Sequence, residues 1–458
     1  MKNKTRLVVL GAGYGGITLA AHLDNKVSNN DMQIILVNIN SYHELIQEAH
    51  LVAGGFRNLV DVRIPISDLI KDTNIQFIQS NVKKVRADEN KIILENSDEI
   101  VYDFLVVALG ASTQFFGIKG AKEYALTLRS TDDGLTIHHK ISKLIDNEKS
   151  NNGISNGKGI KNITIVGGGP TGVGVAGALA DLMNHNSSSK KAKILIITAS
   201  PTILPGFDTR TIDEVVRILH RKSISIITNT TASEVRQDSV ILGDGLKGAR
   251  GHIPSSITIW TPGIKGYDLH IEPHIEKTNN GRIVVNDFCQ VNDFHNIFCI
   301  GDISAMKEPS SSEIKNPPLA HIAISQAIYL AESIAEFFMH KIKPSQEFRS
   351  EVNVRILSLG LNDYVGLLNN MLVTGDMARI IKEFKKEAHL ESISSGETTI
   401  ATKIYKNDPV SNLLSSVFVT ISSLSKTLRN RVPVPGTMSN EEGHALTTEK
   451  IDDLKDKA

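Results

Sequence analysis

The sequence predicts an α/β fold with two Rossmann-like dinucleotide-binding domains, followed by a C-terminal region with amphipathic helices. Two observations predict it. A short apolar strand, a glycine-rich turn and a helix follow one another near the N-terminus, and the same pattern restarts near residue 163. In such a unit the glycine turn and the helix N-terminus bind the pyrophosphate of a dinucleotide. A chain of 458 residues is long enough for the two or three domains that this fold requires.

The first unit contains four glycines in a fixed order. The strand Arg6–Leu10 leads directly into Gly11-Ala-Gly13-Tyr-Gly15-Gly16. In this pattern Gly11 makes the tight turn, and Gly13 lets the backbone approach a pyrophosphate. Gly16 permits close packing of the helix on the strand. Gly11, Gly13, Gly15 and Gly16 are therefore predicted to bind a dinucleotide.

The second unit repeats this architecture with little identity beyond the glycines. Its strand is Ile163–Val166, and Gly174 and Gly177 continue the small face of its helix. The predicted nucleotide-binding residues of this unit are Gly167, Gly169, Pro170, Thr171 and Gly172. A single fingerprint can be an ordinary turn. Two copies, each between an apolar strand and a helix, favour a flavoprotein that binds two nucleotides.

Neither unit carries the acidic residue expected at the end of its second strand. The strand Gln33–Val37 ends at Asn38, and the corresponding strand of the second unit ends at Thr198. Asn38 can hydrogen-bond a ribose hydroxyl, without the stronger charge-assisted contact of a carboxylate. Thr198 provides no acid that would repel a 2′-phosphate, and no arginine stands nearby to bind one. Both NADH and NADPH therefore stay open as donors.

Composition limits the other classes of function. Fifty basic residues balance fifty acidic ones, so no overall positive field indicates a nucleic-acid partner. The two cysteines, Cys289 and Cys299, form no CxxC pair, so we expect no zinc site, iron–sulfur cluster or disulfide framework. This cysteine usage is typical of the cytosol. No stretch approaches roughly 18 consecutive apolar residues, so none is expected to span a membrane.

Three further segments resemble those of flavoproteins that contain an FAD domain and a nicotinamide-nucleotide domain. Val107–Thr113 resembles the crossing where the chain leaves the FAD domain, and Ile259–Gly263 resembles the return crossing. Asn296–Asp302 is similar to the third FAD motif, whose aspartate accepts a hydrogen bond from the ribityl chain. The resemblance covers residues 5–340. It implies nucleotide contacts by Ala108, Gly110, Gly263, Gly301 and Asp302.

This order of motifs implies a division of the chain into four parts. An FAD-binding domain in two pieces, residues 1–118 and 265–342, encloses an NAD(P)H-binding domain at residues 119–264. Residues 343–458 form a C-terminal region for membrane association and dimerisation, with a polar, disordered tail. The stretch Ser150–Gly159 is polar and rich in glycine, which predicts a loop.

Within that superfamily the chain most resembles the type II NADH dehydrogenases, single-subunit NADH:quinone oxidoreductases that do not pump protons. Gly167–Val173 is similar to their NADH-binding stretch, although Gly174 stands where their motif has a glutamate. Ala320–Gln326 resembles their AQxAxQQ segment, which lies beneath the flavin and lines the quinone site. The resemblance implies FAD as cofactor, NADH as donor (with NADPH possible) and a membrane quinone as acceptor.

The match to the AQxAxQQ segment is incomplete. Ala320, Ala323 and Gln326 match it, whereas His321 and Ser325 replace glutamines. The resemblance implies that Ala320 lies beneath the flavin and that Gln326 hydrogen-bonds a quinone carbonyl. His321 could donate or relay a proton to the reduced quinone. The alternative is a histidine that packs at the start of a helix.

The residues missing from the chain distinguish it from other members of the superfamily. Ser41–Ile46 stands where disulfide reductases of this fold carry CxxxxC, so no dithiol can accept electrons there. Sulfide:quinone oxidoreductases also need a redox cysteine pair. Cys299 falls within the predicted strand Asn296–Ile300, and Cys289 precedes it, so both are predicted to be structural. His43 either lies near the flavin ring or packs within its own loop.

Two amphipathic helices are predicted in the C-terminal region. The first opens at Asp376 as its N-cap and runs to Leu390. The second opens with Asp408-Pro409 and ends at a basic cluster over residues 426–431. Each apolar face can lie in the lipid interface, or cover the protein's own core or a dimer partner. The resemblance implies a homodimer attached peripherally, through the second helix, to the cytoplasmic face of the cell membrane.

Two alternative functions use the same fingerprints. One is a soluble NAD(P)H-dependent reductase of a small redox protein. The other is a flavoprotein with a binding or signalling role, similar to the apoptosis-inducing-factor relatives. The amphipathic C-terminus argues against the first, and slow flavin reoxidation by every quinone would favour the second.

Overall fold

The computed structural model describes residues 4–150, 162–185, 192–243, 251–307, 314–341, 346–349 and 354–396. Residues 1–406 form one compact unit, and every element described below belongs to it. The second predicted amphipathic helix and the polar tail lie outside the described residues. Most of the predicted loop Ser150–Gly159 lies outside them as well.

The first fingerprint belongs to a parallel sheet of five strands in the order β21-β9-β1-β2-β5. These strands are β1 (Thr5–Leu10), β2 (Met32–Asn38), β5 (Gln76–Gln79), β9 (Phe104–Val107) and β21 (Ile297–Cys299). All of their pairings are parallel. The edge strand β21 follows the second fingerprint in the sequence, so a distant part of the chain completes this sheet.

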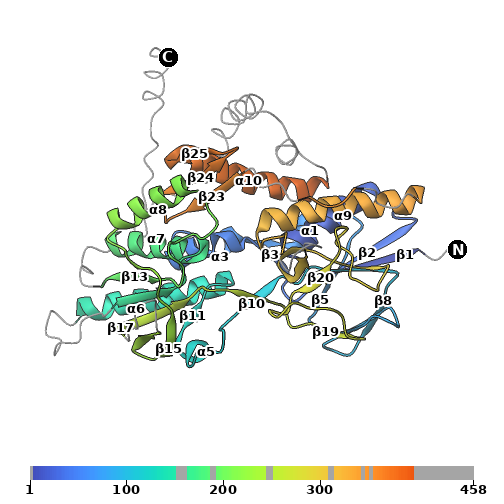
Figure 1. Ribbon diagram of the computed structural model, residues 1–458. Coiled ribbons are helices and arrows are strands. Elements are labelled where there is room, and N and C mark those ends of the chain that lie inside the picture. Colours follow the sequence, from blue (N-terminus) through green and yellow to red (C-terminus); the bar gives the residue numbers. More distant parts are fainter. Residues whose placement is uncertain are drawn as a thin grey trace, which may run out of the picture. The chain divides into compact units, whose positions relative to one another are not determined.

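The second fingerprint belongs to a sheet of seven strands, in the order β14-β13-β12-β17-β16-β15 with β11 paired to β17. These strands are β11 (Leu126–Thr127), β12 (Asn162–Val166), β13 (Ile194–Ile197), β14 (Ser225–Ile227), β15 (Ala232–Arg236), β16 (Ser239–Leu242) and β17 (His252–Trp260). The first strand of each fingerprint pairs in parallel on both sides. Two such sheets confirm the predicted α/β class with two Rossmann-like halves (Figure 1).

The long helices follow the strands as the sequence predicts. α1 (Tyr14–Lys26) begins in the first fingerprint and α7 (Pro170–His185) begins in the second. The other long helices of the two halves are α6 (Thr131–Ser150), α8 (Thr209–Arg221) and α9 (Ala320–His340). α9 packs along α1, which brings the AQxAxQQ-like segment to the first fingerprint.

Shorter elements connect and cover the two sheets. In the first half they are β3 (Tyr42–Glu44), η1 (Ile46–Glu48), α2 (Ala49–Ala53), α3 (Leu59–Val62), β4 (Arg63–Pro65) and α4 (Ile66–Leu69). A smaller sheet contains β6 (Val82–Arg86), β7 (Lys91–Leu94), β8 (Glu99–Val101) and β19 (His270–Glu272). The rest are β10 (Ala111–Thr113), α5 (Ala121–Tyr124), β18 (Ile264–Gly266), β20 (Ile283–Val285), η2 (Gly301–Ile303) and β22 (Ser304–Met306).

The run Val101–Leu109 (VYDFLVVAL) is mostly apolar and by its sequence predicts one buried strand, but this prediction is wrong, because the chain turns between β8 and β9. The Asp103 carboxylate accepts a hydrogen bond from the Arg6 backbone N–H, with a distance of 2.6 Å. The Tyr102 backbone N–H still donates to the Asn90 carbonyl beside the β7–β8 pairing, whereas the Asp103 backbone N–H donates to the Arg6 carbonyl of β1. β8 therefore ends in the small sheet, and β9 begins in the large one.

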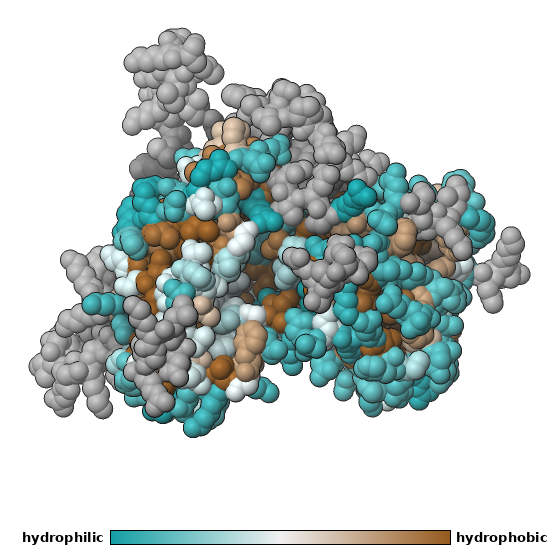
Figure 2. Space-filling model, viewed as in Figure 1, coloured by the Kyte–Doolittle hydropathy of each residue, from teal (hydrophilic) through white to brown (hydrophobic). Residues whose placement is uncertain are grey.

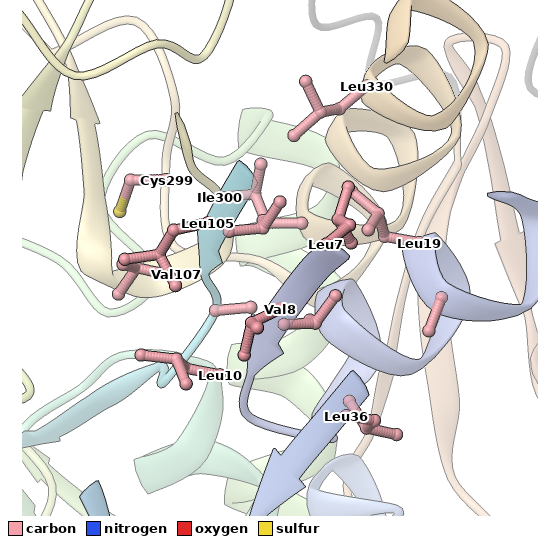
Figure 3. Packing of buried hydrophobic residues seen from close by; sticks show 14 of the residues in the cluster. Leu7, Val8, Leu10, Leu19, Leu36, Leu105, Val107, Cys299, Ile300 and Leu330 are labelled. Atoms are coloured by element: carbon pink, nitrogen blue, oxygen red, sulfur yellow. The ribbon is translucent and has the colours of Figure 1, made fainter. Parts of the chain in front are cut away.

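The core of the first half consists of the aliphatic residues that the apolar strands supply. Leu7, Val8 and Leu10 of β1 are fully buried, as are Leu105 and Val107 of β9. Figure 3 shows these side chains gathered around β1, with Leu330 of α9 pointing toward the same cluster. Burying each such side chain stabilises the fold by about 1.5–3 kcal/mol. This core fixes the position of the turn that follows β1.

The helix α9 is long and apolar enough to cross a membrane, with 21 residues and a mean hydropathy of 1.3. More than half of its apolar window is buried inside the molecule. Its buried residues include Leu330, Ala331 and Ile334, which belong to the core of the first half. α9 is therefore accounted for as a core helix of the first half.

The C-terminal region adds an antiparallel sheet and a long helix. β23 (Val354–Ser358), β24 (Tyr364–Leu368) and β25 (Met371–Thr374) form the sheet, and α10 (Gly375–Ser395) follows directly. The sheet contacts α7 and α8, whereas α10 contacts α1, so this region touches both halves (Figure 1).

The helix α10 differs from its prediction at both ends. Thr374, not Asp376, is its N-cap, because the chain enters the helix straight from β25 through Gly375 at a φ of 57°. Asp376 lies in the first turn and pairs with Arg379 at 2.9 Å. Ile381 and Ala388 of the predicted apolar face are buried within this molecule. Of the two uses foreseen for this helix, the described structure shows it covering the protein's own core.

The surface mixes polar and apolar side chains. Figure 2 shows one face, on which hydrophilic residues cover most of the periphery and apolar residues show near the middle and on one side. The large exposed apolar side chains include Val60, with 80% of its surface exposed, and Phe116, with 59%. Phe116 follows β10 at the crossing between the two halves, where it contacts Gly263.

Candidate active site

Sterics within the chain explain two of the glycines of the first fingerprint, Gly11 and Gly16. Gly11 has a φ of 102°, and a Cβ there would lie 2.5 Å from the Ala108 carbonyl oxygen. A Cβ on Gly16 would lie 1.9 Å from the Gly11 carbonyl oxygen. Around Gly13, in contrast, no atom lies within 4 Å of the Cβ position. The turn therefore packs tightly against the rest of the chain at Gly11 and Gly16, and it leaves open space around Gly13.

The second fingerprint has the same steric pattern. Gly167 has a φ of 108°, and a Cβ there would lie 2.5 Å from the Thr261 hydroxyl oxygen. A Cβ on Gly172 would lie 2.0 Å from the Gly167 carbonyl oxygen. The Cβ position of Gly169 has no neighbour within 4 Å. Pro170 and Thr171 form the first turn of α7, whose N-terminus carries the partial positive charge that attracts a phosphate.

The glycines at the two crossings have backbone torsions that favour glycine. Gly110 and Gly263 both have a positive φ, of 69° and 66°. β10 and β18 pair antiparallel at this place, so the outgoing and the returning chain form one ribbon. The Cβ of Ala108 lies 3.3 Å from the Cβ position of Gly16. Ala108 therefore belongs to the wall of the first fingerprint turn, whereas no atom lies within 4 Å of the Cβ position of Gly110.

The starts of α1 and α9 meet at the same place. The Cβ position of Gly15 lies 3.3 Å from the Ile300 side chain and 3.4 Å from the Ala323 carbonyl oxygen. The Cβ position of Gly301 lies 3.4 Å from the Ala323 side chain. Ala320 begins α9 and is half-buried. The third FAD motif and the AQxAxQQ-like segment are thus adjacent to the first fingerprint.

Both residues at the expected ribose positions bond to their own chain. The Asn38 amide oxygen accepts from the Ala12 backbone N–H at 3.0 Å, and its amide nitrogen donates to the Asn40 carbonyl at 2.8 Å. The Thr198 hydroxyl accepts from the Ser200 backbone N–H at 3.4 Å. Asn38 keeps one further N–H for a ribose hydroxyl. Its main contact in this structure holds the glycine turn.

Asp302 lies beside an arginine that the motif comparison missed. Its carboxylate is 3.7 Å from a guanidinium nitrogen of Arg129, which lies just before α6. Burial raises the pKa of Asp302, while Arg129 and Arg282 act in the opposite direction. Among the described residues, the Arg129 Nε atom is buried without a hydrogen-bond partner. Only the folded chain shows this pairing, because the two residues are far apart in the sequence.

The expected role of Gln326 at a quinone carbonyl is not supported by its position. Its side chain is fully buried. Its amide oxygen accepts from the Gly301 backbone N–H at 2.8 Å, and its amide nitrogen donates to the Ser304 hydroxyl at 3.4 Å. Both ends of the Gln326 amide therefore hold the loop that carries Asp302.

His321 lies in the first turn of α9 and is half-buried. Burial, together with the nearby cations Lys385 and Arg355, lowers the pKa of His321 to about 3. Its Nε2 atom is buried and has no hydrogen-bond partner among the described residues. Burial also lowers the pKa of Lys385, to about 8. A neutral imidazole thus lies near a lysine that titrates just above neutral pH.

Gly174 is another position at which the chain departs from the type II motif, and the space beside it is filled by His50. The Cβ position of Gly174 lies 3.5 Å from the His50 ring and 3.2 Å from the Ser358 carbonyl oxygen. Next to His50, the buried Glu48 pairs with Lys382 at 2.8 Å. Burial alone would raise the pKa of Glu48, but Lys382 and His50 lower it, to about 2. The glutamate missing from α7 therefore leaves no gap, and a buried carboxylate stands close by on η1.

His43 is buried against the first fingerprint turn, a contact that neither of its two interpretations named. Its ring is fully buried and its Nδ1 atom lies 2.9 Å from the Ala12 carbonyl oxygen. Cys289 and Cys299 are fully buried as well, and burial raises the pKa of both thiols. Both cysteines are part of the core, as expected for structural residues.

A family model described as pyridine nucleotide-disulphide oxidoreductase matches residues 5–327. The chain belongs to this family. The match spans both fingerprints, both crossings and the start of α9, so it covers every segment on which the superfamily was inferred.

The relatives within the family confirm the resemblance to type II NADH dehydrogenases. The type II NADH:quinone oxidoreductase of Staphylococcus aureus strain MSSA476 is 28% identical over 391 residues, covering 83% of this chain and 94% of that protein. NDH2 from Plasmodium falciparum, solved in complex with NADH, has a TM-score of 0.75 and 18% identity, covering 88% of this chain and 100% of that one.

A sulfide:quinone oxidoreductase has a similar fold. The enzyme from Aquifex aeolicus has a TM-score of 0.73 and 21% identity, covering 86% of this chain and 93% of that one. At such identity the likeness shows the fold alone. The buried cysteines of this chain do not form the accessible redox pair that sulfide oxidation needs.

Proposed function

We propose that this protein is an FAD-dependent NADH:quinone oxidoreductase of the type II kind, which does not pump protons. The observation that carries this proposal is the pair of fingerprint turns with the same steric pattern, each closed by two glycines and open at the third. A family match over both turns and curated relatives of this activity support it.

FAD is assigned to the first turn and NADH to the second, with NADPH still possible as a donor. Bound FAD supplies a ring that accepts a hydride from the nicotinamide and passes two electrons on. The open backbone at Gly13, the wall at Ala108 and the carboxylate of Asp302 fit such a dinucleotide. In the second turn, Gly169 and the N-terminus of α7 hold the donor's pyrophosphate. Positioning the two rings provides most of the rate enhancement.

On the acceptor side, His321 is assigned to proton handling. A quinone takes up two protons when it is reduced, so a group near the flavin that can give or relay a proton accelerates the reaction. The unpaired Nε2 atom of His321 and the low pKa of Lys385 support this role. Gln326 is assigned to holding the Gly301 loop.

The two sheets support the proposed domain division. Residues 1–118 and 265–342 supply the strands of the first sheet, and residues 119–264 supply those of the second. Residues 343–458 include the sheet and helix that touch both halves. We assign peripheral attachment to the cytoplasmic face of the membrane, and homodimer formation, to this last part. The basic cluster at residues 426–431 supports the membrane assignment.

Anaerobic stopped-flow mixing tests the function. The purified, FAD-loaded chain is mixed with NADH, and in a second step with a short-chain quinone. We expect rapid bleaching of the flavin absorbance, followed by reoxidation within the time of one turnover. If neither NADH nor NADPH bleaches the flavin, the assignment of a nicotinamide nucleotide as hydride donor is wrong. Bleaching followed by negligible reoxidation with every quinone favours the binding or signalling alternative.

A further inference from the structure

The peptide groups on either side of Ala12, in the middle of the first fingerprint, are both held by side chains. The Ala12 N–H donates to the Asn38 amide oxygen at 3.0 Å. The Ala12 carbonyl oxygen lies 2.9 Å from Nδ1 of His43, the central residue of β3. Asn38 comes from the end of β2. Two neighbouring elements thus fix the orientation of this short loop.

The contact with His43 sets the direction of the next N–H group. A peptide unit is planar and trans, so the Gly13 N–H points opposite to the Ala12 carbonyl. That carbonyl points toward His43, which is fully buried. The Gly13 N–H therefore points away from His43, and no atom lies within 4 Å of the Cβ position of the same residue. In a dinucleotide fingerprint, this side is where the pyrophosphate oxygens are bound.

A second histidine, His389, lies within hydrogen-bond distance of His43. Because a carbonyl only accepts, His43 must carry its proton on Nδ1, which leaves Nε2 as an acceptor in the neutral ring. Nε2 of His389 lies 3.3 Å from that atom and is positioned to donate. His389 belongs to α10 and is 5% exposed. The ring of Tyr14 contacts both imidazoles, with centroids 5.1 Å from His43 and 4.7 Å from His389.

We propose that His43 and His389 are positioning residues that hold the Gly13 N–H toward the FAD pyrophosphate, and so couple the contact of His389 on α10 to flavin retention. This inference rests on the assignment of FAD to the first turn. α10 packs on α1 as far as Gly396, whose Cβ position lies 2.8 Å from the Ala21 carbonyl oxygen. Coupling between two sites is reciprocal, so bound FAD in turn stabilises the docked α10.

Matched variants of the full-length chain separate the hydrogen bonds from simple packing. His43→Leu removes the donor to Ala12, whereas His43→Asn keeps an N–H close to the position of Nδ1. His389→Leu removes the donor to Nε2 of His43, whereas His389→Gln keeps an N–H at the position of Nε2 of His389. The control is His22→Leu. His22 is a fully buried histidine of α1 that bonds Ser392 of α10 at 3.0 Å and makes no bond to the fingerprint.

The measurement is the dissociation constant of FAD for the flavin-depleted chain, by fluorescence titration. We expect His43→Leu to bind FAD about tenfold more weakly, the loss of one well-placed hydrogen bond. His43→Asn, His389→Gln and His22→Leu should stay within about twofold of the original chain. NADH binding at the second turn, measured on the same samples, should not change and reports that each variant is folded.

Hydrogen exchange provides a readout that simple packing would not change. FAD should slow exchange in the peptides of α10 in the original chain, and should slow it much less in His389→Leu. Unchanged FAD binding by His43→Leu overturns this inference alone, and equal losses in His43→Leu and His22→Leu also overturn it. A chain that binds no FAD in any form overturns the proposed function, and this inference with it.

Discussion

At the scale of single residues, the structure separates two roles that look alike in the sequence. Gly16 is required because a side chain there would overlap the Gly11 carbonyl. Gly13 is required for another reason, because its backbone torsions suit any residue and the space around it is open. Gly16 is therefore required for folding, and Gly13 is required for binding a ligand.

Two substitutions test this separation. Gly16→Ala should destabilise the chain by ~2 kcal/mol or more, because the overlap must be relieved by moving backbone atoms. Gly13→Ala should unfold at nearly the same urea concentration as the original chain, yet retain much less flavin, because the new methyl group stands where the pyrophosphate approaches. Urea unfolding and the flavin content after dialysis measure the two effects. Equal losses of stability in both variants would contradict the assignment.

The role of His321 can be separated from packing by measuring the two half-reactions. His321→Ala should leave flavin reduction by NADH unchanged and slow reoxidation by quinone by about tenfold or more, since a positioned group that relays a proton contributes that much or more. His321→Gln, which restores the residue of the type II motif, is the matched comparison. Unchanged reoxidation in His321→Ala would show that the histidine only packs at the helix start.

The glycines could be predicted from the sequence because their requirement is local. A positive φ or a close helix–strand contact is set by residues that are neighbours in the turn. The true partners of Gln326, Asn38 and His43 could not be predicted in this way. Their hydrogen bonds go to Gly301, Ala12 and Asn40, and the side chain that satisfies a given peptide group depends on how distant segments pack.

At the scale of elements, the β23–β24 hairpin is anchored on the second half by charge. Lys222, at the end of α8, bonds Asp181 of α7 and pairs with Asp363 of the hairpin at 2.9 Å. The lysine side chain is only 7% exposed. The Cβ position of Gly177 on α7 lies 2.1 Å from the Leu359 carbonyl oxygen, so helix and hairpin touch through their backbones.

Removal of that lysine should loosen the hairpin. Lys222→Met leaves two carboxylates near each other without a buried cation, which should cost ~2–3 kcal/mol of unfolding free energy. Arg217→Ala, which breaks an ion pair of an exposed arginine on the same helix, is the control and should cost less than ~1 kcal/mol. Urea unfolding of the two variants measures the difference. Equal costs would mean that the buried lysine does not anchor the hairpin.

Element ends were predicted less well than element types. The sequence pattern predicts one apolar strand through Tyr102 and Asp103, because both flanks are hydrophobic. The break depends on the bond between Asp103 and the Arg6 backbone, which only the assembled sheet provides. In the same way, Asp376 is a good N-cap by residue type, but the preceding strand and Gly375 fix the helix start at Thr374.

At the scale of the whole molecule, buried histidines make stability depend on pH. The pKa of His43 is lowered from 6.5 to about 4 by burial, that of His22 to about 4, and that of His50 to about 3. His43 and His22 approach His389, whose pKa burial and both neighbours lower as well. The unfolded chain therefore binds more protons than the folded chain between pH 6.5 and about 4.

The unfolding free energy should accordingly be highest above pH 6.5 and fall as the pH decreases toward 4. A fall of ~2 kcal/mol or more is expected, since one unit of pKa shift corresponds to about 1.4 kcal/mol. Urea unfolding at several pH values measures it. His43→Asn removes one of the titrating rings and should show a shallower slope, and identical slopes would exclude this histidine as a cause.

The membrane assignment concerns the part of the chain that follows α10. Deleting the residues after Pro409 should release the protein from membranes, because the basic cluster and the second predicted apolar face are then absent. NADH-dependent flavin reduction should persist, since both fingerprints stay intact. Sedimentation with vesicles that contain anionic lipid measures the release. Retention of the truncated chain on those vesicles would place the attachment elsewhere.

The parallel pairing of β21 with β9 has a consequence for biosynthesis. The sheet that carries the first fingerprint lacks its edge strand until residues 297–299 have left the ribosome, and α9, which packs on α1, is made later still. The second sheet is complete before that point, because its last strand ends at Trp260. The domain whose fingerprint is translated first is therefore completed last during synthesis. Ribosome-bound chains that end before residue 297 should acquire protease resistance in the second domain and retain no flavin.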